Sequence, residues 1–458
     1  MIIRKFGGSS MIQLDSVANI LDREAQQGDV TVVSAFKGVT DLLIQCAKRA
    51  YYSVDYSKQL EEIRNIHQGI IDSNKLDYSC IQEQITELEQ ILNTEFKTER
   101  QENQEDDIED IKNLQYIDHQ FAAIVQSFGE RLSSRVLAAK LTQMDHTSQA
   151  FDAFDIGMIT DSNYLNSSPT NKATKEIKQG SLSNYQGLAI VTGFIGKDTE
   201  GNITLLGSRG GSDFSATYFG AALEAEKTEI WTDTLFRTAD PRIIENTKVI
   251  RLLSYREAGQ LAYYGAKILH PDSIGPAERT GMPIVIRDTT DSEDQGTLIT
   301  QEGEVHDEIV KSITSKPVYL VRTESVEHAY ESGFAEYVFG AFRRHGISVD
   351  MIATSNTEIA CSVDIKNGNK TALDEAVKEI NQEYGEKSAY IEKGTQINVV
   401  GEGMKDRPGV SAKILCAITS KGINDEIVSK GGEINFGFVV QEQHGNNAVK
   451  AIHEEYFC

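Results

Sequence analysis

An internal repeat in the last third of the chain limits the folds that it can adopt. Residues 333–353, GFAEYVFGAFRRHGISVDMIA, align with 409–429, GVSAKILCAITSKGINDEIVS, at a constant offset of 76 residues. Each copy predicts a helix, a glycine turn and a strand, and flanking apolar segments extend this to βαββ followed by another helix. The first copy has a further strand at 389–392, but the second ends at Cys458 before one can form. We therefore expect the two small units to share strands or to pair across chains.

The longer first part of the chain has a different order of elements. Apolar segments at 1–5 and 30–36 predict buried strands that run into glycine-containing loops. From about residue 41 to residue 140 the pattern is helical, with an acidic stretch at 98–110 between two helical segments. Further strands are expected at 188–192, 203–206, 229–231 and 283–287, and helices at 213–226, 255–264 and 272–280. This alternation predicts a largely parallel α/β sheet.

Charge and cysteine content narrow the class of protein. The 458 residues include 45 Lys and Arg against 69 Asp and Glu, a formal net charge of −24. This argues against nucleic-acid binding, which depends on clustered basic residues, and any anionic ligand must meet local positive charge. The five cysteines form no CxxC pair, so neither a disulfide framework nor a zinc site is predicted. Without a signal-peptide core or a membrane-spanning apolar run, a cytoplasmic protein that binds no membrane is expected.

Two glycine-rich loops are candidate binding sites. In the first, Gly7-Gly8-Ser9-Ser10 follows a strand, so backbone N–H groups can approach an anion and Lys5 can add positive charge. A plain tight turn explains this loop equally well. The second loop, residues 207–213, has Ser212 and Asp213 at a helix start, where both are ordinary capping residues. Its functional interpretation is that Arg209 holds a carboxylate or phosphate while Asp213 takes an ammonium group or orients the loop.

Other polar loops agree with the functional interpretation. Thr232 and Asp233 follow a predicted strand, Arg242 ends the motif TADPR, and Lys267 lies in GAKILHP. Taken singly, Arg242 can be a solvated turn residue and Lys267 a surface cation. Together with Lys5, they place three basic residues at expected strand or helix ends of an acidic domain. Neutralising the charge of a triphosphate is a use for such an arrangement.

Seven motifs, in this order along the chain, resemble those of the aspartokinase family. They are KFGGSS at 5–10, VVSAFKGVTDLL at 32–43, SFGERLSS at 127–134, VTGFIG at 191–196, RGGSDFSA at 209–216, TADPR at 238–242 and GAKILHP at 265–271. The paired repeat resembles ACT domains, sensors that commonly bind amino acids. The resemblance implies an amino acid kinase fold, an α/β fold with a parallel-rich sheet between helices, at 1–305. Two ferredoxin-like ACT domains would follow at 312–392 and 393–458.

The same resemblance implies transfer of the ATP γ-phosphoryl group to the β-carboxylate of L-aspartate, with Mg²⁺ as cofactor and 4-phospho-L-aspartate as product. Lys5 and Asp213 are its expected catalytic residues, and no metal site made of side chains is expected. Aspartate is expected at Thr40, Glu130, Arg209 and Asp213, ATP at Lys5, Gly7, Gly8, Ser9, Thr232, Asp233, Arg242 and Lys267, and an inhibitory amino acid at Asp350, Thr354 and Ser355. Lysine or threonine would be that effector. The strand missing from the second repeat suggests a homodimer built through the tail.

The chain departs from the family pattern at three places. Ser208 is an extra residue before Arg209, where relatives usually read LGRGGSD. Phe236 and Arg237 stand where relatives commonly have an aromatic contact, so stacking by Phe236 and phosphate contact by Arg237 both stay open. Asn356 replaces a glutamate that is common in lysine-sensitive relatives, so the identity of the effector is open.

Two other functions are considered. One is a kinase of another amino acid, such as glutamate or acetylglutamate, which SFGERLSS together with the ACT tail disfavours. The other is a catalytically weak amino-acid sensor whose altered loops at 207–213 and 234–237 no longer bind ATP well. Retention of Lys5, Asp213 and Lys267 argues against it.

Overall fold

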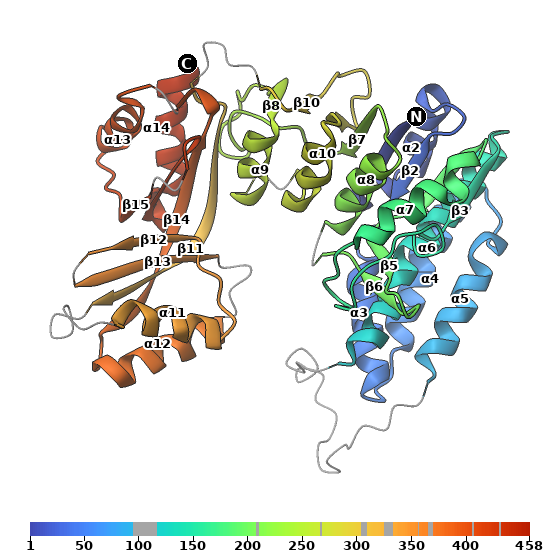
Figure 1. Ribbon diagram of the computed structural model, residues 1–458, viewed down its shortest axis with the longest axis horizontal. Coiled ribbons are helices and arrows are strands. Elements are labelled where there is room, and N and C mark those ends of the chain that lie inside the picture. The colour runs from blue at the N-terminus through green and yellow to red at the C-terminus, as the bar shows by residue number, and fades with distance from the viewer. Residues whose placement is uncertain are drawn as a thin grey trace. The chain divides into compact units, whose positions relative to one another are not determined.

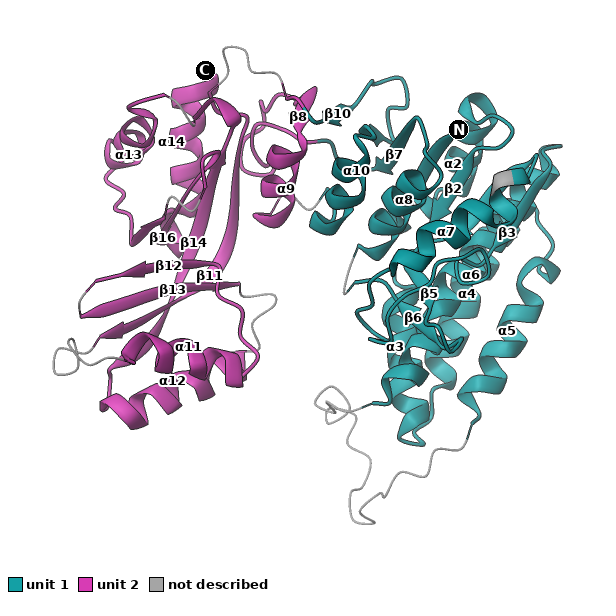
Figure 2. Cartoon of the chain, in the orientation of Figure 1, with its two compact units in different colours: residues 1–235, 268–301 teal, residues 236–267, 302–458 magenta. Residues whose placement is uncertain are grey.

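The computed structural model describes residues 1–94, 117–207, 210–265, 268–303, 309–324, 333–355, 357–364, 370–404, 407–429 and 432–458. They form two compact units (Figure 2): unit 1 is residues 1–235 and 268–301, and unit 2 is residues 236–267 and 302–458. The structure therefore groups an internal stretch, 236–267, with the C-terminal part of the chain. The domain limits at 1–305, 312–392 and 393–458 stay a prediction, and the acidic stretch at 98–110 lies outside the described residues.

Unit 1 is built on a mostly parallel sheet, as the alternation of strands and helices predicts. Within this unit the strand order is β3-β4-β2-β1-β7-β9-β10. The strands are β1 (Ile2–Phe6), β2 (Val30–Val33), β3 (Ser148–Phe151), β4 (Leu188–Thr192), β7 (Lys227–Thr232), β9 (Ile284–Asp288) and β10 (Thr297–Thr300). β10 runs antiparallel to β9, and the other neighbours in this row are parallel. A short antiparallel hairpin is formed by β5 (Ile195–Lys197) and β6 (Ile203–Leu205).

Helices pack on this sheet and on one another (Figure 1). They are α1 (Gly8–Met11), α2 (Leu14–Glu24), α3 (Val39–Tyr51), α4 (Ser57–Ser73), α5 (Ser79–Leu92), α6 (His119–Gln143), α7 (Asn171–Gln179), α8 (Gly211–Ala222) and α10 (Ile274–Thr280), with single 3-10 turns at Ser181–Asn184 and Pro271–Ser273. The long helix α6 is buried over most of its length because it packs both on β3 and β4 and on α3 and α5. No helix among the described residues is long and apolar enough to cross a membrane.

Unit 2 contains one antiparallel sheet with the strand order β12-β13-β11-β14-β16-β15. Its strands are β11 (Ser312–Glu324), β12 (Met351–Thr354), β13 (Glu358–Asp364), β14 (Ala389–Val400), β15 (Ile427–Ser429) and β16 (Asn435–Gln441). The helices of the repeat are α11 (Phe334–Arg344), α12 (Lys370–Tyr384), α13 (Val410–Thr419) and α14 (Gly445–Phe457), with 3-10 turns at Glu402–Met404 and Glu442–His444. The stretch 236–267 adds β8 (Leu252–Ser254) and α9 (Tyr255–Tyr263) to this unit.

The two halves of unit 2 share their central strands. Residues 312–323 of β11 pair with 389–400 of β14 in one continuous antiparallel ladder. Along β11, β13 pairs with residues 318–324, and along β14, β16 pairs with residues 394–400. Each long strand is thus the first strand of one βαββαβ half and the last strand of the other. The strand missing from the second repeat is supplied by the same chain, so the missing strand gives no argument for a dimer.

Two local predictions in this unit are corrected. The strands expected at 389–392 and 397–400 are parts of the single strand β14. The strands expected to begin at Ile347 and Ile423 begin at Met351 and Ile427. The reason is a helix-ending turn: Gly346 has a φ of +66°, and the N–H of Ile347 donates to the Phe342 carbonyl, a geometry that closes a helix before a strand can start.

Candidate active site and sensor site

The loop between β1 and α1 lies at the switch point of the parallel sheet. From β1 the chain first adds β2 on one side, and β7 later takes the place on the other side. In open α/β sheets, ligands bind beyond the carboxyl ends of the strands at such a point. Gly7 follows the end of β1, and Thr232 ends the neighbouring strand β7. The two loops that were expected to contact ATP therefore emerge side by side.

Lys5 and Asp213 form the central ion pair of this region. The Lys5 Nζ lies 2.5 Å from Oδ1 of Asp213, and the two side chains are only 11% and 9% exposed. The other carboxylate oxygen of Asp213 accepts a hydrogen bond of 3.2 Å from the backbone N–H of His270. Asp213 lies in the first turn of α8. This helix begins directly after Gly210, whose φ is +82°. Both expected catalytic residues are thus held together, and His270 is a contact that the sequence reasoning missed although it lies in the motif GAKILHP.

Glycines let three backbone segments approach one another around this pair. A Cβ on Gly8 would lie 2.7 Å from the carbonyl oxygen of Ala35, and a Cβ on Gly129 would lie 2.7 Å from the Ala35 Cβ. The same Cβ on Gly129 would lie 3.8 Å from Oγ1 of Thr40 in the first turn of α3. The loops after β1 and β2 and the middle of α6 are therefore in close contact. This places Thr40 and Glu130, both expected to bind aspartate, at one wall of the same region.

Glu130 is a buried carboxyl group with unused hydrogen-bonding capacity. It is 4% exposed, and its Oε2 atom has no hydrogen-bond partner. Burial raises the pKa of Glu130 from 4.5 to about 8, although the Ala35 backbone N–H and the Lys5 ammonium act in the opposite direction. A buried acceptor of this kind needs a partner, and a cationic ligand would supply one. The arrangement therefore suits an ammonium group better than a second anion.

The remaining residues expected at ATP are partly placed. Gly7 lies in the loop after β1, Gly8 begins α1, and Ser9 is exposed in the same helix. At the end of β7, Thr232 is half-buried and Asp233 exposed, and the Thr232 carbonyl accepts a hydrogen bond of 2.9 Å from the Thr289 N–H. Thr289, which follows β9, is a further residue of this edge that the sequence reasoning did not single out.

Four of the residues singled out lie outside the described residues: Ser208, Arg209, Lys267 and Asn356. Arg242 belongs to unit 2, where it is 82% exposed and its guanidinium lies 2.6 Å from the carboxylate of Asp240. Phe236 is 1% exposed, so its ring is not free to stack on a base. The guanidinium of Arg237 donates to the side chain and the carbonyl of Thr247, at 2.7 and 2.8 Å. These donors of Arg237 are therefore used within unit 2.

The residues expected to bind an effector lie around the edge strand β12 of unit 2. Asp350 precedes this strand, and its carboxylate is 2.6 Å from the Lys316 Nζ and 3.2 Å from the hydroxyl of Tyr263. Burial and the carboxylate of Asp350 raise the pKa of Tyr263 to about 12, so this hydroxyl stays a donor. Thr354 and Ser355 are exposed, and the Ser355 hydroxyl accepts hydrogen bonds from the next turn. Asp350 is thus engaged inside the protein, whereas the other two are accessible.

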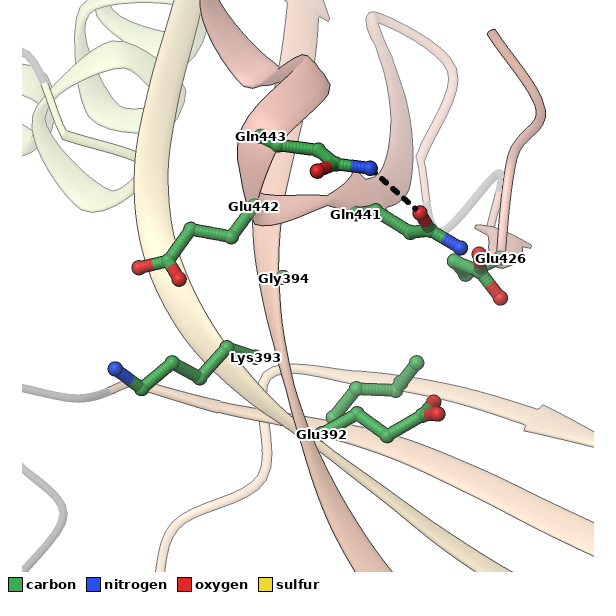
Figure 3. A pocket seen from close by; sticks show the side chains of 8 residues that line it. Glu392, Lys393, Gly394, Glu426, Gln441, Glu442 and Gln443 are labelled. Carbon is green, nitrogen blue, oxygen red and sulfur yellow. Dashed lines mark hydrogen bonds between the residues drawn. The ribbon is translucent and has the colours of Figure 1, made fainter.

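A separate cavity of about 350 Å³ lies beside the paired strands β11 and β14 (Figure 3). Its lining is mostly charged or amide: Glu392, Lys393, Gly394, Glu426, Gln441, Glu442 and Gln443, with Leu320. The guanidinium of Arg322 connects side chains next to this cavity, because it forms ion pairs with Glu358, Glu392 and Glu426 at 2.7, 3.2 and 2.8 Å. The cavity contains none of the three expected effector residues.

Comparison with known proteins identifies the family. A model described as the amino acid kinase family matches residues 1–288, well over half of the chain. The chain belongs to the amino acid kinase family. An ACT domain model also matches residues 397–456. The predicted fold class, an amino acid kinase fold followed by ACT-type structure, is therefore confirmed.

The resemblance to aspartokinases is confirmed over the full chain of this amino acid kinase. Lysine-sensitive aspartokinase 3 of Escherichia coli (strain K12) is 27% identical over 100% of this chain and 99% of its own length. Aspartokinase 1, chloroplastic, of Arabidopsis thaliana is 29% identical over 99% of this chain and 80% of its own length. The crystal structure of E. coli aspartokinase III in complex with lysine and aspartate has a TM-score of 0.78 at 26% identity, and that of Clostridium acetobutylicum aspartate kinase has 0.77 at 25%. Both alignments cover 100% of each chain.

Proposed function

We propose that this amino acid kinase is an aspartate kinase. A β-carboxylate oxygen of L-aspartate attacks the γ-phosphorus of ATP, the bond from that phosphorus to the β,γ-bridging oxygen breaks, and ADP leaves. The product is 4-phospho-L-aspartate, the first intermediate towards lysine, threonine and methionine. The observation that carries the proposal is the buried Lys5–Asp213 pair at the switch point of the sheet, with the unpaired buried oxygen of Glu130 on a carboxyl group whose pKa burial raises and the Lys5 ammonium lowers. The full-length likeness to aspartokinases supports it.

The chemistry asks the protein to align and neutralise two anions. Aspartate needs no general base because a β-carboxyl group of pKa ~3.9 is already ionised at neutral pH. Lys5 supplies positive charge to the phosphoryl group in transfer, and Asp213 fixes the direction of the Lys5 ammonium. Glu130 binds the α-ammonium of aspartate with Thr40 beside it, and Arg209 takes a carboxylate. Gly7, Gly8, Ser9, Thr232, Asp233, Arg242 and Lys267 are proposed for ATP.

Mg²⁺ is proposed as the partner ion of ATP. Asp233, exposed after the end of β7, offers carboxylate oxygens, the ligand type that Mg²⁺ prefers, for at most one contact. In the described part of the chain, no three His, Cys, Asp or Glu side chains gather to hold a metal ion. Phosphate and water oxygens would therefore complete its coordination. When bound, the ion neutralises charge on the β- and γ-phosphates.

We also propose feedback control through unit 2. Asp350, Thr354 and Ser355 are the proposed binding residues for an inhibitory amino acid, and lysine or threonine is the proposed effector. That E. coli aspartokinase III has been crystallised with lysine supports a regulated enzyme.

A homodimer through the edge strands of unit 2 is proposed on new grounds. Ile352 on β12 is 46% exposed and Val428 on β15 is 36% exposed. The two residues occupy equivalent positions of the repeat, since they are 76 residues apart. Exposed apolar side chains on unpaired edge strands favour pairing with another chain. The cell compartment is proposed to be the cytoplasm, in keeping with five cysteines that all remain free.

The deciding experiment is acyl phosphate formation from ATP, Mg²⁺ and L-aspartate, trapped with hydroxylamine, with L-glutamate and N-acetyl-L-glutamate as parallel substrates. Turnover that requires aspartate and is at least tenfold slower with the others supports the proposal. Turnover with another acceptor would reassign the substrate. If folded protein binds lysine or threonine but neither turns over any acceptor nor binds ATP by calorimetry, the protein is a sensor and the proposal fails.

A further inference from the structure

Three residues from separate parts of unit 2 meet at the carboxylate of Asp350. Lys316, on β11, has its Nζ 2.6 Å from Oδ2 of Asp350 and 3.5 Å from Oδ2 of Asp364. The side chains of Lys316 and Asp350 are only 12% and 8% exposed. Tyr263, the last residue of α9, donates its hydroxyl hydrogen to Oδ1 of Asp350 at 3.2 Å. Both oxygens of the carboxylate are therefore in use.

This arrangement bears directly on the effector site. An amino-acid effector that binds Asp350 through an ammonium group has to compete with an ammonium that the protein already places there. The competition is strong because charge-assisted hydrogen bonds of about 2.7 to 2.9 Å between such groups are among the strongest in proteins. An effector ammonium that binds the same oxygen of Asp350 therefore competes directly with Lys316.

Lys316 and its strand also lie close to residues 263–265, the segment that ends at the first residue of the motif GAKILHP. The Lys316 Nζ lies 5.5 Å from the ring centre of Tyr263 and 5.9 Å from that of Tyr264, so its charge faces both rings. A Cβ on Gly265 would lie 3.4 Å from the Ser315 carbonyl oxygen, which shows how closely this segment follows β11. Departure of Lys316 would remove the cation from both rings.

We propose that Lys316 and Tyr263 form a latch on Asp350, which an amino-acid effector opens when its ammonium group replaces that of Lys316. Opening the latch releases Tyr263 and Tyr264. This release transmits the binding of an effector at Asp350 to the segment that leads into GAKILHP. The inference rests on the proposed aspartate kinase function only for its inhibition readout. Its binding readout is independent of catalysis.

Two variants separate the role of Lys316 as a competitor of the effector from the role of Tyr263 in transmitting effector binding. Lys316→Met removes the competing ammonium and keeps the length of the side chain, whereas Tyr263→Phe removes only a hydroxyl from a residue that is 50% exposed. Matched controls in the same unit are Lys413→Met, which breaks an ion pair of 2.9 Å with Glu455, and Tyr456→Phe, which removes a hydrogen bond of 3.3 Å to Val410. Thermal unfolding of each variant checks that it is folded.

The probes are L-lysine and L-threonine, with calorimetric dissociation constants measured on the full chain and inhibition measured as trapped acyl phosphate. For the amino acid that binds, Lys316→Met is expected to lower the dissociation constant by roughly five- to tenfold, within the usual range of coupling between sites. Tyr263→Phe is expected to keep the dissociation constant within about twofold while the maximal inhibition falls by at least half. The controls are expected to behave as the wild type.

Several results would overturn the latch. One is a Lys316→Met variant that folds and binds no more tightly than the wild type, and another is the absence of binding of both amino acids to both proteins. If Lys316→Met does not fold, full retention of inhibition by Tyr263→Phe is enough to reject the proposal. Failure of the kinase function appears instead as absent turnover of the wild type while the binding measurements remain interpretable.

Discussion

The ammonium nitrogen of Lys5 lies 2.5 Å from a carboxylate oxygen of Asp213, although the two residues are separated by more than two hundred positions in the chain. β1 contributes one and the first turn of α8 the other. The pair is held on its far side by the N–H of His270. This fixed geometry is the basis of the first prediction.

Replacing Lys5 with Met is expected to lower kcat by roughly 10²- to 10³-fold, the usual cost of removing one group that stabilises developing charge. Aspartate binding should persist because Glu130 and Thr40 do not depend on Lys5 for their position. The measurements are trapped acyl phosphate and calorimetric titration with aspartate. Lys172→Met, at an exposed lysine of α7, is the control. Turnover within a few-fold of the wild type would remove Lys5 from the mechanism.

The raised pKa of Glu130 predicts a pH-dependent affinity for aspartate. With a pKa of about 8 in the free protein, the carboxyl group is mostly protonated at pH 7 and must lose its proton before it pairs with an ammonium group. The KM for aspartate should therefore fall roughly fivefold as pH rises from about 7 to 8, and by about a further twofold above pH 8 before it levels off. Glu130→Gln should raise the KM at pH 8 and flatten its pH dependence. An aspartate KM that is constant across this range would contradict the assignment.

The same group also affects stability, with a definite sign. Burial raises its folded-state pKa above the ordinary 4.5, so the folded state binds the proton more tightly than the unfolded state does. Its contribution to stability is therefore largest at low pH and is lost as pH rises from about 4.5 towards 8. Comparing the free energy of unfolding of the wild type and Glu130→Gln at pH 6 and pH 8 measures this. The wild type should lose stability relative to the variant at the higher pH.

Two glycines in helices should respond to alanine in opposite directions. A Cβ on Gly69 in α4 would meet nothing within 4 Å, so Gly69→Ala should stabilise the protein by about 1 kcal/mol through helix propensity. A Cβ on Gly129 in α6 would lie 2.7 Å from the Ala35 Cβ, so Gly129→Ala should destabilise it by about 1 to 3 kcal/mol. It should also raise the KM for aspartate, because the displaced loop adjoins Thr40 and Glu130. Equal shifts in melting temperature for both variants would show that Ala35 moves aside freely.

The proposed dimer can be tested at the exposed edge residues. Ile352→Glu places a charge on the edge strand β12 and should shift the protein from dimer to monomer in light scattering after size exclusion. Glu61→Gln, at an exposed position of α4 in unit 1, is the control. A wild type that is already monomeric at micromolar concentration would reject the dimer.

Pattern and motif predict much of the fold, and the failures have local causes. The strand expected at 188–192 is found with the same limits because its residues are apolar on both sides, as a buried parallel strand requires. β14 was expected as two strands because Lys393 and Gly394 interrupt the apolar pattern. In the structure a Cβ on Gly394 would lie 2.7 Å from Cγ1 of Val439, so this glycine serves close packing between strands and not a turn. Glycine serves both turns and close packing between strands, and the sequence alone does not distinguish these two uses.

The candidate active site, like the fold, is predicted only in part by the sequence. Motifs bring Lys5, Glu130 and Asp213 to attention, but only the fold shows that Glu130 has an unpaired buried oxygen. The sequence leaves Phe236 open as a stacking residue because relatives commonly have an aromatic contact near this position. Its burial in unit 2 depends on how 236–267 joins residues far along the chain, which no local pattern encodes.

The exchange of strands between the halves of unit 2 makes the sensor region indivisible. Residues 312–317 complete the sheet of the second half, and residues 389–393 complete that of the first. Cutting the chain between the repeats would therefore leave each piece without one of its strands, with an unpaired sheet edge and an incomplete hydrophobic core. Protein engineers who wish to graft this regulation onto another enzyme must move residues 309–458 as one piece, together with the stretch 236–267 that carries Tyr263. Natural recombination faces the same restriction, so the duplication that produced the repeat is expected to be inherited as a single block.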